Sequence, residues 1–197
     1  MLAEVAVGRD GAGEDCSPRL RRGPQLPSGV ERAERDVRAS ARAEILGAAM
    51  SSADCAVNAW PDDPYPLVRT MQLALQDAGL GPGDVDVVYA SANATRVLDG
   101  IEARALVTLF GGSRAIVTSI KGAIGECGAS GAAACAAAIL CGAAGRVPPV
   151  AGLRRPDPVT EGLRLATEAV DVPGNMVLVN SVASGGGIAT VIMRVLV

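Results

Sequence analysis

The feature that most constrains the fold of this chain is the alternation of strand-like and helix-like segments along its central part. Residues 44–50, 85–90 and 115–118 are short apolar runs, and each predicts a strand. Between them, residues 66–75 carry apolar side chains at helical spacing, and residues 99–109 predict a second helix that Asp99 opens. Strands that alternate with helices favour an α/β domain in which helices pack on a mainly parallel sheet.

The C-terminal part extends this pattern. Residues 127–145 are an uncharged, alanine-rich run that predicts a helix ended by Gly145, and they lack the roughly 20 strongly apolar residues of a membrane-spanning helix. We therefore expect a buried helix of a soluble domain. Residues 176–180 and 188–195 predict two strands around a glycine triplet. The whole order predicts a layered α-β-α domain with a mixed five-stranded sheet, mainly parallel with an antiparallel edge.

Composition limits how the core can pack and what it can bind. Apolar residues make up 49% of the chain but aromatic residues only 2%, so the core must consist of Ala, Val, Leu, Ile and Gly in close backbone contact. A core of this kind is expected to need a partner surface. The net charge of -3 comes without a basic stripe interleaved with aromatics, so nucleic acid is not expected as a partner.

The N-terminal region predicts two further features. Residues 1–29 are rich in Gly, Pro and Arg without a period, so we expect a flexible leader ahead of a domain at residues 30–197. Residues 30–42 have the charge spacing of an exposed helix. The first residues lack a signal peptide's basic start and apolar core, and the five cysteines include no CxxC pair. We expect a cytoplasmic protein with reduced thiols and without a metal or a membrane.

The chain also carries an ordered set of short motifs. They are Glu-Ile-Leu-Gly at 44–47, Asp-Ala-Gly-Leu at 77–80, Glu-Ala at 102–103, Leu-Phe-Gly at 109–111, Ser-Ile-Lys at 119–121, Gly-Ala-Ser-Gly at 128–131, Val-Pro-Pro at 147–149 and Asn-Ser at 180–181. Each is weak alone, but the ordered set resembles the C-terminal half of β-ketoacyl-acyl-carrier-protein synthases. The resemblance covers most of the chain and implies a thiolase-like C-terminal domain.

This resemblance places substitutions at both catalytic histidines of the family. The chain contains no histidine; Ser91 stands at the first position and Glu126 at the second. In the family, the two histidines stabilise the thioester oxyanion and assist decarboxylation. A carboxylate cannot replace an imidazole donor unless it is protonated. The resemblance therefore implies a retained fold that has lost the standard chemistry.

Three other positions match the family. Lys121, the only lysine of the chain, matches the lysine beside the second histidine, and Asp99 and Glu102 match acidic positions of the network that supports the histidines. A buried ammonium needs a charged or hydrogen-bonded partner. We expect a stabilising Lys121–Glu102 pair, with a catalytic role of Lys121 as the alternative.

The glycine triplet occupies the place of the family's gating loop, Gly-Phe-Gly-Gly-Thr-Asn. The resemblance assigns an acyl-pocket loop to Asn180, Ser181, Ser184, Gly185 and Gly186, with Ser184 where the gating phenylalanine would stand. The alternative is a tight strand connection that uses the freedom of glycine at positive φ. Loss of the aromatic residue favours this alternative.

The nucleophilic cysteine of the family belongs to its N-terminal half, to which no segment of this chain corresponds. Cys127 is not expected to replace it, because the chain has no histidine to act as its base. Whether the chain is an enzyme therefore stays open.

Two functions from different classes follow from the resemblance. The first is the C-terminal domain of a β-ketoacyl synthase-like acyltransferase of fatty acid or polyketide biosynthesis, present as a fragment or a split gene product and unable to condense as this chain. The second is a non-catalytic partner similar to the chain-length-factor subunits of active ketosynthases. Both imply an acyl carrier protein or acyl thioester as partner, a homodimer or a heterodimer with a ketosynthase, and no cofactor.

Overall fold

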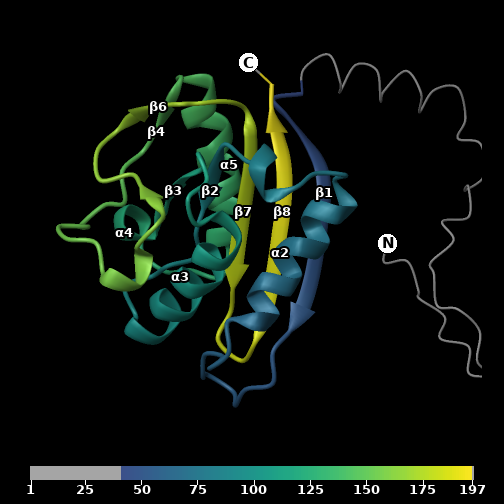
Figure 1. The fold of residues 1–197 in the computed structure, drawn as a ribbon, viewed down its shortest axis with the longest axis vertical. Helices are drawn as coiled ribbons and strands as arrows, with labels where there is room; N and C mark the ends of the chain where they lie inside the picture. Colours follow the sequence, from purple (N-terminus) through teal and green to yellow (C-terminus); the bar gives the residue numbers. More distant parts are fainter. Residues whose placement is uncertain (1–40, 197) are drawn as a thin grey trace, which may run out of the picture. The chain divides into compact units, whose positions relative to one another are not determined.

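The computed structural model describes residues 41–196 (Figure 1). The leader predicted at residues 1–29 lies outside this range, as do the domain start at residue 30 and nearly all of the charged helix predicted at residues 30–42. Within the described range, strands and helices alternate as far as the third strand, in the order that the sequence predicts.

Six strands form the main sheet, in the spatial order β1-β8-β7-β2-β3-β5. They are β1 (Ala43–Ser52), β2 (Val87–Tyr89), β3 (Ile116–Thr118), β5 (Arg164–Leu165), β7 (Met176–Val182) and β8 (Gly187–Val195). All five predicted strands form, but the predicted number is wrong by one. The additional strand, β5, has two residues and is too short to leave an apolar pattern in the sequence.

The pairing of the strands confirms a mixed sheet with an antiparallel edge. β7, β2, β3 and β5 pair in parallel, whereas β7, β8 and β1 pair antiparallel. Figure 1 shows the three long strands β1, β8 and β7 side by side, with α2 (Tyr65–Asp77) across β1 and β8. The carboxyl ends of β2 and β3 lie at the same edge of the sheet, because these strands are parallel neighbours.

Helices cover both faces of the sheet, which confirms the layered α-β-α arrangement. Helices α2 and α3 (Arg96–Phe110) pack on one face, and α5 (Ser130–Ala143) packs on the other. Successive strand residues point to opposite faces. Val88 and Leu178 accordingly join the core beneath α2 and α3, whereas Val87 and Val177 join the core beneath α5.

Short elements complete the described chain. They are α4 (Lys121–Ile124), two 3-10 helices at Pro82–Asp84 and Pro158–Thr160, and a separate two-stranded sheet of β4 (Arg146–Val147) and β6 (Val170–Asp171). No helix within residues 41–196 is long and apolar enough to cross a membrane.

The sequence predicts the C-terminal end of helix α2 correctly but misplaces the start of helix α3. Helix α2 ends in the predicted glycine cap: Gly79 has a φ of 67°, its N–H donates to the Gln76 carbonyl, and the Leu80 N–H donates to the Leu75 carbonyl. Helix α3 begins at Arg96, three residues before the predicted start. The Asp99 N–H already donates to the Thr95 carbonyl, so Asp99 closes the first turn rather than opening the helix.

Helix α5 is not the buried helix that the sequence predicts. Ser130, Ala134 and Ala138 are buried at four-residue intervals, whereas Leu140 is 68% exposed. An alanine-rich helix is apolar on every side, so its sequence does not indicate how many of its sides are covered. Within the described residues, the sheet covers one side only.

The substitution Gly47→Ala is expected to destabilise the packing of β1 on α2. A Cβ at Gly47 would lie 2.5 Å from the Ala78 backbone nitrogen and 2.6 Å from the Ala74 carbonyl oxygen. Overpacking of this kind costs about 1–3 kcal/mol, so the free energy of unfolding, measured by urea denaturation, should fall by that amount. Gly83→Ala is the control, because a Cβ there meets nothing within 4 Å. Equal stability of the two variants would contradict the close packing.

Candidate functional site

The candidate site forms where β2 and β3 end. Ser91 follows β2, and Lys121 follows β3 at the start of α4. Because the carboxyl ends of these parallel neighbours meet at one edge, the two side chains lie together, and the Lys121 Nζ donates a hydrogen bond to the Ser91 Oγ over 3.0 Å. Glu126, between α4 and α5, completes an ion pair with Lys121 at 2.9 Å. The structure thus brings together Ser91, Lys121 and Glu126.

Ser91 is fixed from three sides. Its Oγ accepts hydrogen bonds from the Lys121 Nζ and from the Val182 backbone N–H, each over 3.0 Å, and its own N–H donates to the Glu102 Oε1 over 2.8 Å. The side chain is buried, with 1% of the residue exposed. The hydroxyl therefore links Lys121 to the end of β7 and does not face solvent.

Glu126 is an ionised acceptor. Its Oε2 accepts hydrogen bonds from the Lys121 Nζ over 2.9 Å and from the Asn93 Nδ2 over 2.8 Å, and its Oε1 accepts one from the Ser130 Oγ over 3.0 Å. Partial burial acts to raise the pKa of this carboxyl, but the hydrogen bonds from Lys121, Asn93 and Ser130 outweigh it and hold the pKa below its usual value. At neutral pH Glu126 carries a charge and has no proton to donate.

The predicted Lys121–Glu102 pair is wrong. Among residues 41–196, the ion partner of Lys121 is Glu126, and Ser91 lies between Lys121 and Glu102. The Oε1 of Glu102 is already taken by the Ser91 N–H and by the Asn180 Nδ2, at 2.8 and 2.7 Å. Glu126 is only five residues from Lys121 along the chain, so its carboxylate reaches the ammonium with little loss of chain entropy.

Glu102 is a buried carboxyl with an unusual environment. The residue is 1% exposed, and its Oε2 has no hydrogen-bond partner among the described residues. Burial raises its pKa to about 7, against the smaller lowering effects of the hydrogen bonds from Ser91 and Asn180 and of the Lys121 charge. Glu102 is therefore partly protonated at neutral pH, unlike Glu126.

Asp99 supports the loop that follows β2. Its Oδ1 accepts a hydrogen bond from the Asn93 backbone N–H over 2.9 Å. Burial raises the pKa of this carboxyl, opposed by the backbone hydrogen bonds of Asn93 and Ala94 and by the charge of Lys121. Asp99 thus acts on the site through the backbone of the loop rather than by contact with Lys121.

The residues assigned to an acyl-pocket loop do not share one environment. Asn180 is buried, donates to Glu102 and accepts a hydrogen bond from the Thr190 Oγ1 over 2.9 Å. Ser181 is partly buried on β7, and Ser184 and Gly185 are exposed in the turn to β8. Gly185 and Gly186 have φ of 90° and 91°, and a Cβ at Gly186 would lie 2.2 Å from the Ala53 carbonyl oxygen. The turn therefore requires glycine for its own geometry.

Sequence reasoning missed the two polar residues that complete the Glu126 site. Asn93 and Ser130 both hydrogen-bond to the Glu126 carboxylate. Asn93 stands two residues after Ser91, and Ser130 is the first residue of α5. Glu126 lies in the connection before α5 rather than in a helix, so no helical spacing signalled either contact.

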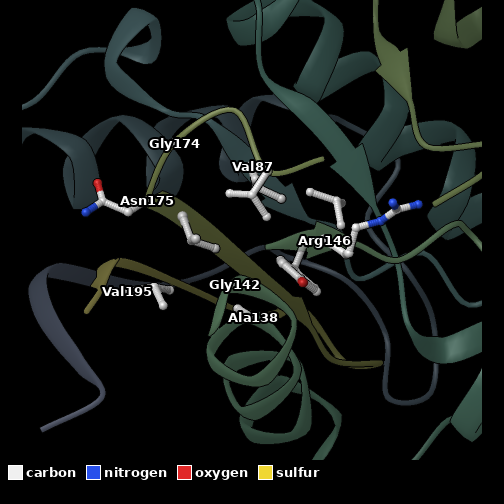
Figure 2. Close-up of a pocket in the computed structure, with 11 residues that line it drawn as sticks. Val87, Ala138, Gly142, Arg146, Gly174, Asn175 and Val195 are labelled. Atoms are coloured by element: carbon white, nitrogen blue, oxygen red, sulfur yellow. The ribbon is translucent and has the colours of Figure 1, made fainter. Parts of the chain in front are cut away.

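A further pocket lies beneath α5, on the opposite face of the sheet (Figure 2). Val87, Ala138, Gly142 and Val195 are among its lining residues, and its volume is about 20 Å³. A cavity of this size holds about one water molecule, so it offers no room for a substrate.

The fold, with helices on both faces of a mixed sheet, is that of a ketosynthase-type C-terminal domain. The family described as β-ketoacyl synthase, C-terminal domain, matches residues 42–154, which is more than half of the chain. The chain therefore belongs to this family.

Relatives and solved structures agree with this assignment. The mitochondrial 3-oxoacyl-[acyl-carrier-protein] synthase of Arabidopsis thaliana is 36% identical over 123 residues, which is 59% of this chain and 26% of that protein. The tetracenomycin polyketide synthase ketoacyl synthase beta subunit of Streptomyces glaucescens is 43% identical over 91 residues, which is 46% of this chain and 22% of that protein. The matches thus cover about a quarter of the length of these curated relatives.

A solved structure shows the same fold. The structure of the ishigamide ketosynthase/chain length factor matches with a TM-score of 0.73 at 29% identity and covers 83% of this chain and 41% of that one. The predicted thiolase-like fold class is confirmed by this likeness.

The substitution Glu102→Gln is expected to change how stability depends on pH. A folded-state pKa of about 7 lies above the unfolded value of 4.5, so the protonated carboxyl stabilises the fold below pH 4.5, and this contribution is lost as the pH rises through 7. The loss is on the order of 3 kcal/mol. Glutamine keeps the Oε1 acceptor without a charge, so the unfolding free energy of the variant should fall much less between pH 5 and pH 8.

Urea denaturation at several pH values measures this effect. The exposed Glu168, changed to glutamine, is the matched control and should keep the wild-type dependence on pH. A Glu102→Gln variant that loses stability with pH as steeply as the wild type would contradict the raised pKa of Glu102.

Proposed function

We propose that residues 30–197 are the C-terminal domain of a β-ketoacyl synthase-like acyltransferase of fatty acid or polyketide biosynthesis, and that this chain does not by itself carry out decarboxylative condensation. The observation that carries the proposal is the ion pair between Lys121 and Glu126, at the position where the family has its second histidine. Family membership supports the class of protein, and the ion pair supports the loss of the chemistry.

Stabilisation of a thioester oxyanion depends on hydrogen-bond donors. A thioester carbonyl that accepts negative charge in the transition state needs donors aimed at its oxygen. Glu126 is ionised and only accepts, so it would repel a developing oxyanion. Ser91 is 1% exposed and its hydroxyl oxygen is held by the Lys121 Nζ and the Val182 N–H, so the hydroxyl is not open to a substrate carbonyl.

We also propose a substrate class, a cellular location and an oligomeric assembly. An acyl thioester on an acyl carrier protein is the substrate class, in agreement with the name of the Arabidopsis relative. We place the protein in the cytoplasm, because the four cysteines of the described chain are free thiols. The exposed side of α5 supports a homodimer or a heterodimer with a ketosynthase, since exposed apolar surface favours association.

A fusion of the N-terminal half of an active β-ketoacyl synthase to residues 42–197 tests the main proposal. The fusion should accept an acyl group on its cysteine, observed by mass spectrometry. Its decarboxylation of malonyl thioester should be at least about 100-fold slower than that of the parent, because the histidine donors are replaced. The double variant Ser91→His and Glu126→His should recover part of this rate.

The exposed Glu168 offers a matched control for the recovery, because Glu168→His adds a histidine away from the site. It should leave the low rate unchanged. Decarboxylation at the parental rate by the unmodified fusion would show that Ser91 and Glu126 suffice, and it would overturn the proposed loss of condensation.

The second candidate function is a non-catalytic partner subunit similar to a chain-length factor. The substitutions at Ser91 and Glu126 favour it, because such a subunit needs the fold without the histidines. The likeness to a ketoacyl synthase beta subunit and to a ketosynthase/chain length factor supports it as well.

Co-expression with a histidine-containing ketosynthase checks this candidate. The two proteins should elute together in size-exclusion chromatography at the mass of a complex. The ketosynthase expressed alone should elute at a mass that does not include this chain. Separate elution of the two proteins at micromolar concentration would count against a partner subunit. It would favour the first proposal, that the chain is a domain of a condensing enzyme.

A further inference from the structure

One part of the sheet face beneath α5 is open among the described residues. Helix α5 packs on β7 and on one end of β8 (Figure 1). β1 is the edge strand beside β8, and side chains directly opposite each other in a strand pair point to the same face. Ile45 lies opposite Met193, which belongs to the core beneath α5. Met50 lies opposite Ala189, four residues from Met193 on β8, so it points to the same face.

The side chains of this open part are exposed and apolar. Ile45 is 70% exposed and Met50 is 83% exposed, although both are large hydrophobic residues. None of the residues on this part is charged; they are Ala43, Ile45, Ala48 and Met50 of β1 and Ala189 and Val191 of β8. We call them the β1–β8 face. Contiguous exposed apolar surface of this kind marks a site of association.

The dimensions of the β1–β8 face suit one helix. Neighbouring strands lie about 5 Å apart, so a face two strands wide measures about 10 Å across. An α-helix with its side chains has a diameter of about 10–12 Å. Because the face carries no charge, the helix that covers it should carry none either, since an unpaired buried charge is costly.

Helix α5 has an exposed side with these properties. Its exposed residues recur every three or four positions and are all apolar: Ala132, Ala136, Leu140 and Ala143. No residue of α5 is charged, whereas α2 and α3 both contain charged residues. Of the helices longer than one turn within residues 41–196, α5 is thus the one that can lie on the β1–β8 face without burying a charge. A second copy of the chain supplies this helix.

The two surfaces are adjacent within one copy. A Cβ at Gly131 would lie 3.0 Å from the Ser181 Oγ of β7, and a Cβ at Gly142 would lie 3.0 Å from the Val195 Cγ1 of β8. This flank of α5 therefore borders the β1–β8 face. A two-fold axis along the border places α5 of each copy on the β1–β8 face of the other and brings the two helices into contact. Because a two-fold contact is closed, both surfaces of both copies are buried at once.

We propose that this chain forms a two-fold homodimer in which α5 of each copy lies on the β1–β8 face of its partner. The two sheets then enclose the two helices in one apolar layer. The inference rests on the homodimer alternative of the proposed function and names the surface that forms it. The dimer does not involve Ser91 or Glu126, so its absence would leave the proposed loss of condensation unaffected.

Size-exclusion chromatography with light scattering of the full chain tests the proposal. At micromolar concentration we expect a mass of twice the 19.8 kDa of one chain. Ala136→Glu on α5 and Met50→Glu on β1 should each raise the dimer dissociation constant at least about 100-fold, because each copy would then bury an unpaired carboxylate. Gln72→Glu is the matched control: it adds the same charge to the exposed side of α2, on the opposite face of the sheet, and should leave the constant unchanged.

Circular dichroism should show an unchanged fold in each variant, because all three positions are exposed in a single copy. A wild-type chain that is a monomer, or an assembly larger than a dimer, would overturn the proposal. A dimer that Ala136→Glu dissociates and Met50→Glu does not would also overturn it, since α5 would then lie elsewhere than on β1. A monomer that binds a histidine-containing ketosynthase and loses this binding with Met50→Glu would replace the homodimer by the partner-subunit candidate.

Discussion

The site depends on the Lys121 ammonium, because a cation with a side chain that is only 6% exposed requires partners. Its bonds to Ser91 and Glu126 hold together the loops after β2 and β3, and Ser91 extends this linkage to the backbone of β7 at Val182. The Glu126 side chain is 44% exposed, so solvent screens this pair and its loss costs less than the loss of a fully buried pair. The bonds of Lys121 to Ser91 and Glu126 are therefore a structural link at this edge of the sheet.

Two glutamates near this edge differ in protonation at neutral pH because their surroundings differ. Glu126 accepts hydrogen bonds from an ammonium, an amide and a hydroxyl, which hold its pKa below the usual value. Glu102 has no cation in contact and is fully buried, so its pKa rises to about 7. Residue type alone thus says little about charge at neutral pH, whereas burial and hydrogen bonds decide it.

Much of the fold could be predicted because its signals are local. The glycine cap of α2, the five longer strands and the hairpin turn at Gly185 and Gly186 each follow from residues close in sequence. Strand β5 could not be predicted, because it owes its existence to pairing with β3 rather than to a pattern of its own. The exposure of Leu140 was missed for a related reason: an apolar helix does not reveal which of its sides another element covers.

The sequence by itself determined the alternation of strands and helices and the absence of histidine, and it predicted family positions for Ser91, Lys121 and Glu126. Only the tertiary structure decided that Lys121 pairs with Glu126 rather than Glu102 and that Asn93 and Ser130 complete the site. The physical reason is the range of the forces involved. Backbone patterns are set by near neighbours, whereas the partner of a buried charge depends on which distant side chains the packed sheet brings within about 3 Å.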